Sequence, residues 1–486
     1  MAYDSLADFV QALERAGELR RIAVEVESHL EVAEIADRAV KGGGPALLFE
    51  KVRGPDGQLS PFPLLINAFG SQRRMNMALG VEDVESLADR VAELLEIKPP
   101  EGFIDKVRLL PRLARLGSYF PETVRSGPCQ EVVEVEGASL YRLPAIQCWP
   151  GDGGPYVTTP QVCSRSPETG KRNVGLYRMQ LFDARTAGMH IHLHHDGAAH
   201  WREATARGER LPMACAIGGD PALTYAASAP LPPGLDELAL AGFVRGKRVK
   251  LVECKTVDAE VSADADFVLE GYLEPGEVRK EGPFGDHTGF YSLADDYPVF
   301  HLTAITRRRD PIYLTTIVGR PPMEDYFLGH ATERLFLPLI RMQLPEVVDL
   351  HMPAEGIFHN MVIVSIRKAY PFHARKVMYA LWGMGQMSLA KVIVVVDADV
   401  NVHDLSEVAW RALASIDPRR DIAFVDGPVD ALEHASSLPH AGSKMGVDAT
   451  AKWASEGFAR EWPPLIEMSP EVKERVSRRW GEYGLD

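Results

Sequence analysis

The segment from Asn173 to His200 has the highest density of potentially reactive side chains in the chain. It contains Arg178 and five of the fifteen histidines, at positions 190, 192, 194, 195 and 200. Each imidazole has to be solvated or hydrogen-bonded, so an ordinary strand rarely carries so many of them. We therefore expect this segment to contact a metal, a phosphate or another bound molecule.

The spacing of three of these histidines is that of one face of a β-strand. His190, His192 and His194 would point to the same side, and the next residue to the other. Imidazole is a common metal ligand, and oxygen atoms from Asn173 and Glu237 would complete a mixed site suited to Mn²⁺ or Mg²⁺. A histidine-rich edge strand that faces solvent has the same pattern, so both interpretations stay open.

A second group of polar residues occurs in the segment EGPFGDHTGFY. Glu281 and Asp286 flank a turn in which Gly and Pro can bring two carboxylates together, and Arg178 occurs in a β-rich run. A buried arginine needs an anionic partner. Two carboxylates beside one arginine can have well-separated pKa values, so that one serves as an acid and the other as a base. The alternative is an ordinary ion pair on a surface hairpin.

Composition limits the class of protein. The chain has 486 residues, of which 46% are hydrophobic and 25% charged, as in a globular protein of two to four domains. Its net charge of −15, with no local basic patch, argues against nucleic-acid binding. No apolar run is long enough to cross a bilayer, and the acidic N-terminus does not resemble a secretory signal. Five cysteines without a CxxC pair fit a reducing cytoplasm.

The first part of the chain alternates helical and extended patterns. Apolar residues at helical spacing predict a helix over residues 6–13, with a cap at Asp4 or Ser5. An extended run over 19–27, a helix over 29–40 and a short apolar strand over 46–52 follow. This alternation predicts a small α/β domain.

The rest of the chain changes pattern twice. Between about 131 and 315, many short β-rich segments, including 188–195, alternate with Gly, Pro or Asp turns, which predicts a mixed barrel or sandwich. We expect one helix to interrupt it, over 235–244. From about 327 helices and strands alternate again, and the apolar run 391–400 is typical of a parallel strand that is buried on both faces.

These segments resemble the UbiD family of aromatic acid decarboxylases, which use prenylated FMN. The resemblance extends over nearly the whole chain and is carried, in the same order, by NVGLYRMQ, EGPFGDHTGFY, TTIVGRPPMED, KVIVVVDADVNVHDL and GSKMGVDATAKW. It implies a multi-domain α/β fold: an N-terminal α/β domain (1–120), a central split β-barrel that binds the flavin (121–325) and a C-terminal α/β domain (326–486). Family members form homodimers or homohexamers.

The resemblance implies reversible, non-oxidative decarboxylation of an aromatic carboxylic acid. Loss of CO₂ leaves electrons in an sp² orbital that the ring cannot delocalise, so the cofactor must supply an electron sink. Arg178, Glu281 and Asp286 correspond to the family's catalytic arginine–acid–acid triad. Arg178 would orient the substrate carboxylate, Glu281 would balance its charge, and Asp286 would deliver a proton to the carbon that loses CO₂.

The same resemblance implies a metal ion beside the cofactor. Asn173, His194 and Glu237 correspond to ligands of Mn²⁺ (or Mg²⁺), which bridges the protein and the cofactor phosphate, with K⁺ close by. The residues that correspond to cofactor contacts are Leu176, Tyr177, Arg178, His190, Ile191, His192, His195, Asp196 and, at the phosphate, Lys391. The family often has Arg, Trp or Lys where this chain has HIHLHHDGA.

Two quinone precursors are the expected substrates. The segment RTAGMHIHLHHDGAAHW and the ending RRWGEYGLD favour a dihydroxynaphthoate of menaquinone synthesis, which we prefer. The segment SKMGVDATAKW favours a 4-hydroxy-3-polyprenylbenzoate of ubiquinone synthesis. Expected partners are a flavin prenyltransferase that supplies the cofactor, further copies of the chain and, for a prenylated substrate, a peripheral membrane contact.

Two functions of other classes remain open. A flavin-free, metal-dependent hydrolase would use the histidines alone and would be colourless. A non-catalytic flavin-binding subunit of a larger carboxylase would bind the cofactor without turnover. The presence of Arg178, Glu281 and Asp286 argues against this last alternative.

Overall fold

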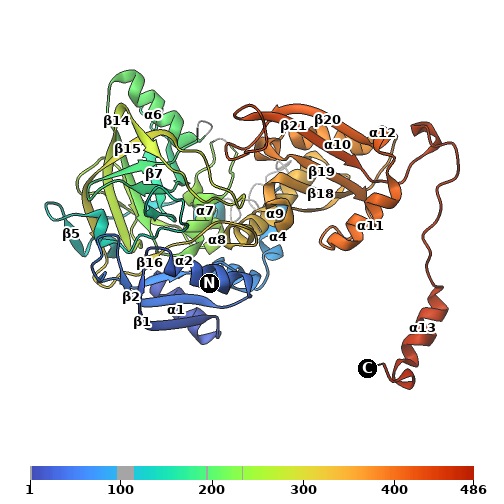
Figure 1. Cartoon of the computed structure of the whole chain (residues 1–486), viewed down its shortest axis with the longest axis horizontal. Helices are drawn as coiled ribbons and strands as arrows, with labels where there is room; N and C mark the ends of the chain where they lie inside the picture. Colours follow the sequence, from blue (N-terminus) through green and yellow to red (C-terminus); the bar gives the residue numbers. More distant parts are fainter. Residues whose placement is uncertain (1–2, 96–113, 193–194, 233, 486) are drawn as a thin grey trace.

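The structure, a computed structural model, describes residues 3–95, 114–192, 195–232 and 234–485. A central β-rich body lies against an N-terminal α/β lobe and is linked through a long helix to a C-terminal α/β lobe (Figure 1). The predicted fold class, a multi-domain α/β protein with a curled central sheet, is confirmed. Within the described ranges, no helix has the length and apolar character needed to cross a membrane.

The N-terminal lobe forms as its sequence pattern predicts. Ser5 caps the first helix by accepting a hydrogen bond from the Asp8 amide, and Leu6, Phe9 and Leu13 are fully buried. The sheet has the order β1-β2-β3-β16, so that a strand from beyond the central body completes it. Its elements are α1 (Leu6–Arg15), β1 (Leu19–Glu27), α2 (Glu31–Lys41), β2 (Ala46–Arg53), β3 (Leu64–Ile66), α3 (Gln72–Ala78), α4 (Glu85–Leu95) and β16 (Tyr313–Leu314).

The central body is built around a nine-stranded sheet of order β6-β9-β10-β15-β14-β11-β7-β8, with β5 paired to β15. A smaller sheet of order β13-β12-β4 lies beside it. The strands are β4 (Glu122–Thr123), β5 (Val132–Glu134), β6 (Tyr156–Val157), β7 (Gln161–Arg165), β8 (Arg172–Leu176), β9 (Met179–Leu181), β10 (Thr186–Met189), β11 (Leu211–Ile217), β12 (Lys250–Glu253), β13 (Glu260–Ser262), β14 (Phe267–Glu281) and β15 (Asp295–Arg307).

Two expectations for this body are wrong. We expected one helix, but the described residues form three: α6 (Asp196–Arg207), α7 (Pro221–Ser228) and α8 (Glu237–Arg245). We also expected a strand over 188–195. Instead, β10 ends at Met189 and the chain continues through His190 and His192 without regular structure. His190 and His192 therefore do not lie on a strand, and His194 lies outside the described residues.

The C-terminal lobe is a five-stranded sheet with helices on both faces. Its order is β17-β18-β19-β21-β20, with β18, β19 and β21 parallel. On β19, Ile393 packs with the cluster around α10, whereas Val394 packs with the cluster around α11, as predicted for a strand buried on both faces. The elements are α9 (Glu324–Gln343), β17 (Val347–His351), β18 (Met361–Ile366), α10 (His373–Trp382), β19 (Val392–Asp397), α11 (Leu405–Ser415), α12 (Pro418–Asp421), β20 (Ile422–Pro428) and β21 (Ala441–Asp448).

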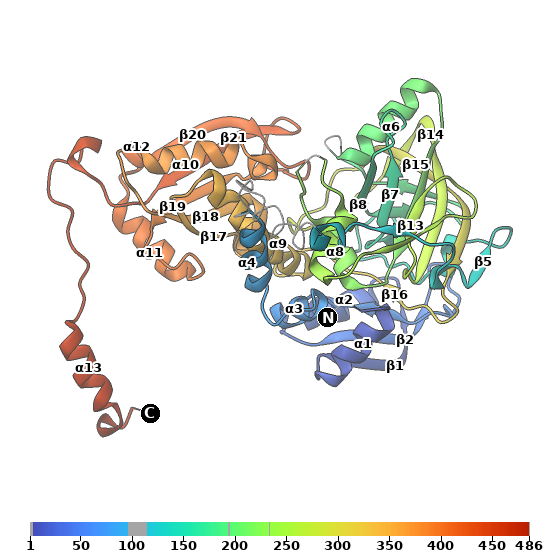
Figure 2. The ribbon, with the colours of Figure 1, turned by 180° about the vertical axis from the view of Figure 1, so that it is seen from behind.

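The chain ends in an arm. Beyond the C-terminal lobe an extended segment leads to α13 (Pro470–Arg478), which stands away from the body in both views (Figures 1 and 2). No residue of α13 is buried, and Ile466 before it is fully exposed. The predicted domain divisions near residues 120 and 325 stay a prediction.

Candidate functional site

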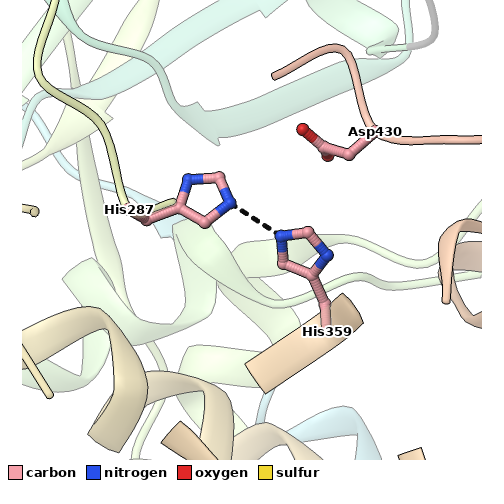
Figure 3. Close-up of side chains that lie close together, drawn as sticks. All are labelled: His287, His359 and Asp430. Carbon is pink, nitrogen blue, oxygen red and sulfur yellow. Dashed lines mark hydrogen bonds between the residues drawn. The ribbon is translucent and has the colours of Figure 1, made fainter. Parts of the chain in front are cut away.

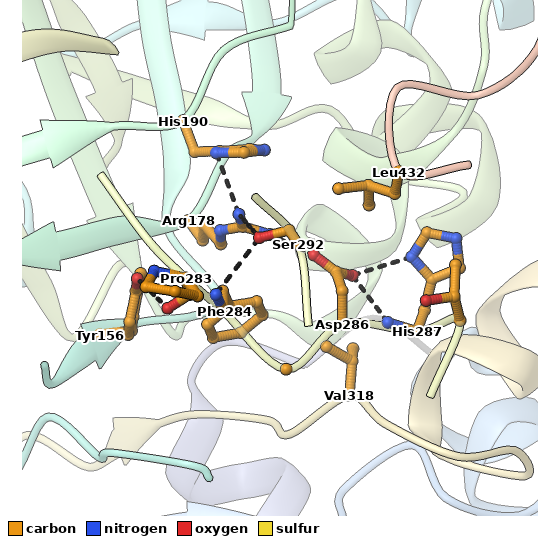
Figure 4. Close-up of polar contacts among 12 residues, drawn as sticks. Tyr156, Arg178, His190, Pro283, Phe284, Asp286, His287, Ser292, Val318 and Leu432 are labelled. Carbon is orange, nitrogen blue, oxygen red and sulfur yellow. Dashed lines mark hydrogen bonds and ion pairs between the residues drawn. The ribbon is translucent and has the colours of Figure 1, made fainter. Parts of the chain in front are cut away.

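The candidate site lies at one end of the central sheet. Arg178 occupies the short connection between β8 and β9, and Glu281 is the last residue of β14. The chain then turns at Gly282, whose φ of +92° belongs to the region that favours glycine. After this turn the chain comes back toward Arg178, and Asp286 contacts the guanidinium (Figure 4).

Arg178 is the centre of a buried ion-pair network. Its Nε donates to Glu281 Oε1 at 3.0 Å, and its Nη1 donates to Asp286. The ring of Phe284 lies under the guanidinium, 4.2 Å from its carbon. Glu281 is completely buried, and the side chain of Arg178 is only 10% exposed. The structure thus brings the predicted triad together, and the alternative of an exposed ion pair on a surface hairpin does not describe it.

The charges of this network shift the pKa values of its members. Burial alone would raise the pKa of Glu281, but the hydrogen bond from His190 and the charge of Arg178 lower it to about 2. Burial would also raise the pKa of Asp286, yet Arg178 and His287 hold it well below its usual range. Both carboxylates are therefore ionised at neutral pH, and they in turn stabilise the charged form of Arg178.

Asp286 also contacts a histidine that links the two lobes. His287 Nδ1 lies 2.8 Å from Asp286 Oδ1, and His287 Nε2 lies 2.7 Å from His359 Nε2 of the C-terminal lobe (Figure 3). Burial would lower the pKa of His287, but Asp286 raises it to about 8. Burial and the charge of His287 lower the pKa of His359 to about 4. The proton between the rings thus belongs to His287, which donates to both neighbours.

The histidines after β10 form a second polar wall. His190 Nδ1 lies 2.8 Å from Glu281 Oε2, and its Nε2 lies 2.6 Å from His192 Nε2. The rings of His192 and His195 stack with centroids 5.0 Å apart, and His195 stacks on Tyr177 at the same distance. Burial and the charge of Arg178 lower the pKa of His190, so that it is neutral. Stacked flat rings of this kind suit an aromatic cofactor or substrate.

Two of the three expected metal ligands lie close together. Asn173 on β8 donates from Nδ2 to the Tyr177 hydroxyl at 3.2 Å, and Glu237 at the start of α8 accepts from the Val174 amide at 3.2 Å. Burial raises the pKa of Glu237 to about 7. A buried carboxylate with so little compensation fits a divalent cation, and the oxygen atoms of Asn173 and Glu237 suit Mn²⁺ or Mg²⁺. His194 lies outside the described residues.

Arg178 and Asp286 line a cavity of about 300 Å³ between the central body and the C-terminal lobe, whereas Glu281, Asn173 and Glu237 are not among its lining residues. The expected cofactor contacts Leu176, Tyr177, Arg178, His190, His192 and His195 all line it. Ile191 is buried beside it, Asp196 begins α6 and is exposed, and Lys391 instead donates to Glu433 at 2.9 Å. Residues that sequence reasoning missed complete the lining: His287, His359, Asp430 and Leu432.

Comparison with known proteins identifies the fold. Residues 10–94, 122–321 and 326–449 match, in order, the N-terminal, Rift-related and C-terminal domains of 3-octaprenyl-4-hydroxybenzoate carboxy-lyase. An uncharacterized protein of Archaeoglobus fulgidus is 49% identical over 484 residues, which is 99% of each chain.

Two solved structures have a similar fold over nearly the whole chain. Vanillic acid decarboxylase of Sedimentibacter hydroxybenzoicus, in its closed form, superposes with a TM-score of 0.86 at 27% identity over 100% of both chains. The UbiD-class enzyme HmfF of Pelotomaculum thermopropionicum, in complex with FMN, superposes with a TM-score of 0.79 at 30% identity and covers 97% of this chain and 98% of its own. Sequence and structure thus agree that the chain belongs to the UbiD family, whose members are carboxy-lyases.

Proposed function

We propose that this protein removes CO₂ non-oxidatively from an aromatic carboxylic acid, with prenylated FMN as its cofactor. The observation that carries the proposal is the buried Arg178 held between Glu281 and Asp286 in the wall of the cavity. The similarity to HmfF, which has been solved with FMN and with prenylated FMN, supports the cofactor. A prenylated flavin bound here would supply the electron sink that the aromatic ring lacks.

Arg178 is the anchor for the substrate carboxylate. A guanidinium presents parallel N–H groups that match a carboxylate, and in this buried setting it stays charged. Glu281 keeps its negative charge because its pKa is about 2, and so it holds Arg178 in place without competing for protons near neutral pH. Phe284 under the guanidinium fixes the plane of Arg178.

Asp286 and His287 together supply the proton. Arg178 holds the Asp286 carboxylate ionised, so an incoming carboxylate that takes over Arg178 removes the main cause of the low pKa of Asp286. The Nδ1 proton of His287, 2.8 Å from Asp286 Oδ1, then moves to Asp286. Asp286 passes it to the ring carbon that has lost CO₂, which places the new C–H bond where the C–C bond was.

The residues that would hold the cofactor lie along one side of the cavity. Tyr177, His192 and His195 offer stacked rings, and Leu176 offers an apolar contact. Asn173 and Glu237, with His194, would bind Mn²⁺ (or Mg²⁺) at the cofactor phosphate, with K⁺ close by. Ile191, Asp196 and Lys391 complete the proposed set of contacts, although Lys391 is paired with Glu433 in this structure.

The cavity supports a hydroxylated aromatic acid as substrate. Leu389 and Leu432 form apolar walls, whereas the C-terminal lobe provides the carboxylate of Asp430 as a hydrogen-bond acceptor and the Nδ1 proton of His359 as a donor. We propose a dihydroxynaphthoate of menaquinone synthesis, because the segments RTAGMHIHLHHDGAAHW and RRWGEYGLD favour this branch. A 4-hydroxy-3-polyprenylbenzoate is the alternative.

We further propose that the protein acts in the cytoplasm as a homo-oligomer. The five cysteines form no disulfide, which fits a reducing compartment. The arm around α13 leaves Ile466, Met468 and Trp480 exposed, as an element that packs on a second copy would. Light scattering on the purified protein tests this, and a monomer at micromolar concentration would contradict it.

The function is tested by co-expression with a flavin prenyltransferase. We expect the purified protein to release prenylated FMN, identified by mass and absorbance, at close to one per chain, and then to decarboxylate one of the two quinone precursors. A protein that binds metal but no flavin, and that hydrolyses esters or amides, would overturn the proposal in favour of a metal-dependent hydrolase.

A further inference from the structure

We propose that the C-terminal lobe contains a second metal site, in which His330, Glu333 and His351 bind one Zn²⁺ ion. None of the three residues lines the catalytic cavity. The proposal does not depend on the decarboxylase function or on the expected metal at Asn173 and Glu237. It rests on the geometry, burial and hydrogen bonding of the three side chains.

Two secondary-structure elements bring the three side chains together. His330 and Glu333 are three residues apart on α9, so their side chains lie on the same face of the helix. His351 is the last residue of β17, which packs against this helix in the C-terminal lobe. One metal-binding atom from each residue lies within 4.8 Å of the others.

The distances are those of the edges of a metal tetrahedron. His330 Nδ1 lies 3.0 Å from Glu333 Oε1, and His351 Nδ1 lies 3.3 Å from Glu333 Oε2. Ligands that surround Zn²⁺ at 2.0–2.1 Å in a tetrahedron are about 3.3 Å from one another. Two imidazoles and one carboxylate form a ligand set that Zn²⁺ commonly adopts, with a fourth position left for water.

Hydrogen bonding alone does not satisfy this group. His330 Nδ1 is buried and makes no hydrogen bond to any described residue, because its lone pair or proton is not directed at the nearby carboxylate. His351 Nδ1 is equally far, at 3.3 Å, from both oxygens of Glu333, which is long for a charged hydrogen bond. A cation between the three atoms would satisfy all of them.

The surroundings hold Glu333 ready as an anionic ligand. Its side chain is completely buried, and the Met352 amide donates to its Oε2 at 2.6 Å, which orients the carboxylate. The nearest guanidinium, Arg334, lies 3.7 Å away and is shared with Asp349 and Glu85. Arg334 therefore does not neutralise Glu333 by itself, and the other partners of this buried carboxylate are the Met352 amide and the two imidazoles that would share the cation with it.

A third histidine, His403, lies next to the three proposed ligands. Its ring centroid is 4.6 Å from that of His351, but its Nε2 is engaged with Asp349 Oδ2 at 3.1 Å. We therefore assign His403 to the surroundings of the site and not to the ligand set. The metal ion would join α9 to β17, immediately before the chain passes through Phe358 to His359 in the cavity wall.

The test is zinc binding by protein expressed without the prenyltransferase. Wild type, Glu333→Gln and the control Glu355→Gln, an exposed carboxylate on the same segment, are stripped with chelator, incubated with Zn²⁺ and desalted. We expect wild type and Glu355→Gln to retain one Zn²⁺ more per chain than Glu333→Gln. With Co²⁺ in place of Zn²⁺, we expect the visible absorption of a tetrahedral complex in the first two proteins only.

A second measurement does not require that Glu333→Gln folds. Zn²⁺ that binds only the folded protein raises the melting temperature. We expect this rise in wild type and in Glu237→Gln, which lacks a ligand of the other expected site. Wild type that retains no Zn²⁺, or a rise in melting temperature that disappears in Glu237→Gln, would overturn the proposal, because the ion would then be absent or bound at the other site.

Discussion

Arg178 forms ion pairs with Glu281 on one side and Asp286 on the other, and its charge lowers the pKa of both carboxylates. Glu281 is held further by His190, whereas Asp286 is held by His287. The two carboxylates are chemically alike but have different histidine neighbours: the pKa of His287, beside Asp286, is raised to about 8, whereas the pKa of His190, beside Glu281, is lowered. This difference supports the proposed roles, in which Asp286 delivers the proton and Glu281 supplies a fixed charge.

The proton source leads to a prediction for the pH dependence of activity. The pKa of His287 is raised to about 8, above its ordinary value, so the charged form predominates below pH 8 and is lost above it. We expect kcat to fall about tenfold per pH unit above this pH. His287→Asn should lose most activity and this pH-dependent decrease together. His301→Asn, at a surface histidine paired with Glu277, should leave the profile unchanged. The same decrease in His287→Asn would show that another group supplies the proton.

Sequence reasoning found the triad but not all of its surroundings. Arg178, Glu281 and Asp286 were predictable because a buried arginine requires carboxylates and the turn after Glu281 brings two of them near each other. His359 and Asp430 were not predictable, because they reach the cavity from the other lobe and neither lies in a pattern that marks chemistry. Contacts between domains have no local signal in a sequence.

Among the elements, pairing explains why the histidine segment is not a strand. Residues 188 and 189 pair with β9, but β9 itself begins at Met179, next to Arg178. Beyond Met189 only the His190 amide continues the pattern, to the Arg178 carbonyl at 3.1 Å. The chain then turns toward the cavity, where the rings contact one another. The sequence alternates as a strand would, but among the described residues the pairing of β10 ends at Met189.

The helix α7 was missed for a different reason. Every residue from Pro221 to Ala227 is buried, so the helix has no polar face and its sequence shows no helical period. The helix α8 was predicted, although its residues from Ala241 to Arg245 are also all buried. Burial alone therefore does not explain which helices were predicted, since α6, which has exposed residues, was missed as well.

The start of α8 allows a test of how an element positions a ligand. Asp236 caps this helix by accepting from the Leu238 amide at 2.8 Å, and Glu237 is the next residue. We expect Asp236→Ala to lower the melting temperature by roughly 2–4 °C, from the loss of about 1 kcal/mol. It should also weaken Mn²⁺ binding, because Glu237 is no longer held.

The matched control is Asp404→Ala, which removes the cap of α11 in the C-terminal lobe. Its melting temperature should fall by a similar amount, with Mn²⁺ affinity unchanged. Equal Mn²⁺ affinity in Asp236→Ala and wild type, measured by titration, would show that the cap does not position Glu237.

For the whole molecule, the three-part organisation was predictable because the pattern of predicted helices and strands changes twice along the chain. The packing of the parts was not. One strand from beyond the central body, β16, completes the N-terminal sheet, and residues of the C-terminal lobe close the cavity. The site is thus a property of the assembled molecule, with the reactive groups on the central sheet and the wall opposite them on another lobe.

The central claim is that Asp286 delivers the proton after CO₂ leaves, and one measurement tests it most directly. Turnover of Asp286→Asn is compared with that of wild type in samples whose prenylated FMN and metal contents are measured and equal. Asp295→Asn, at an exposed carboxylate of β15, serves as the control. We expect Asp286→Asn to lose at least about 100-fold in kcat while the control stays near wild type. Turnover of Asp286→Asn within a few-fold of wild type at equal cofactor content would contradict the account.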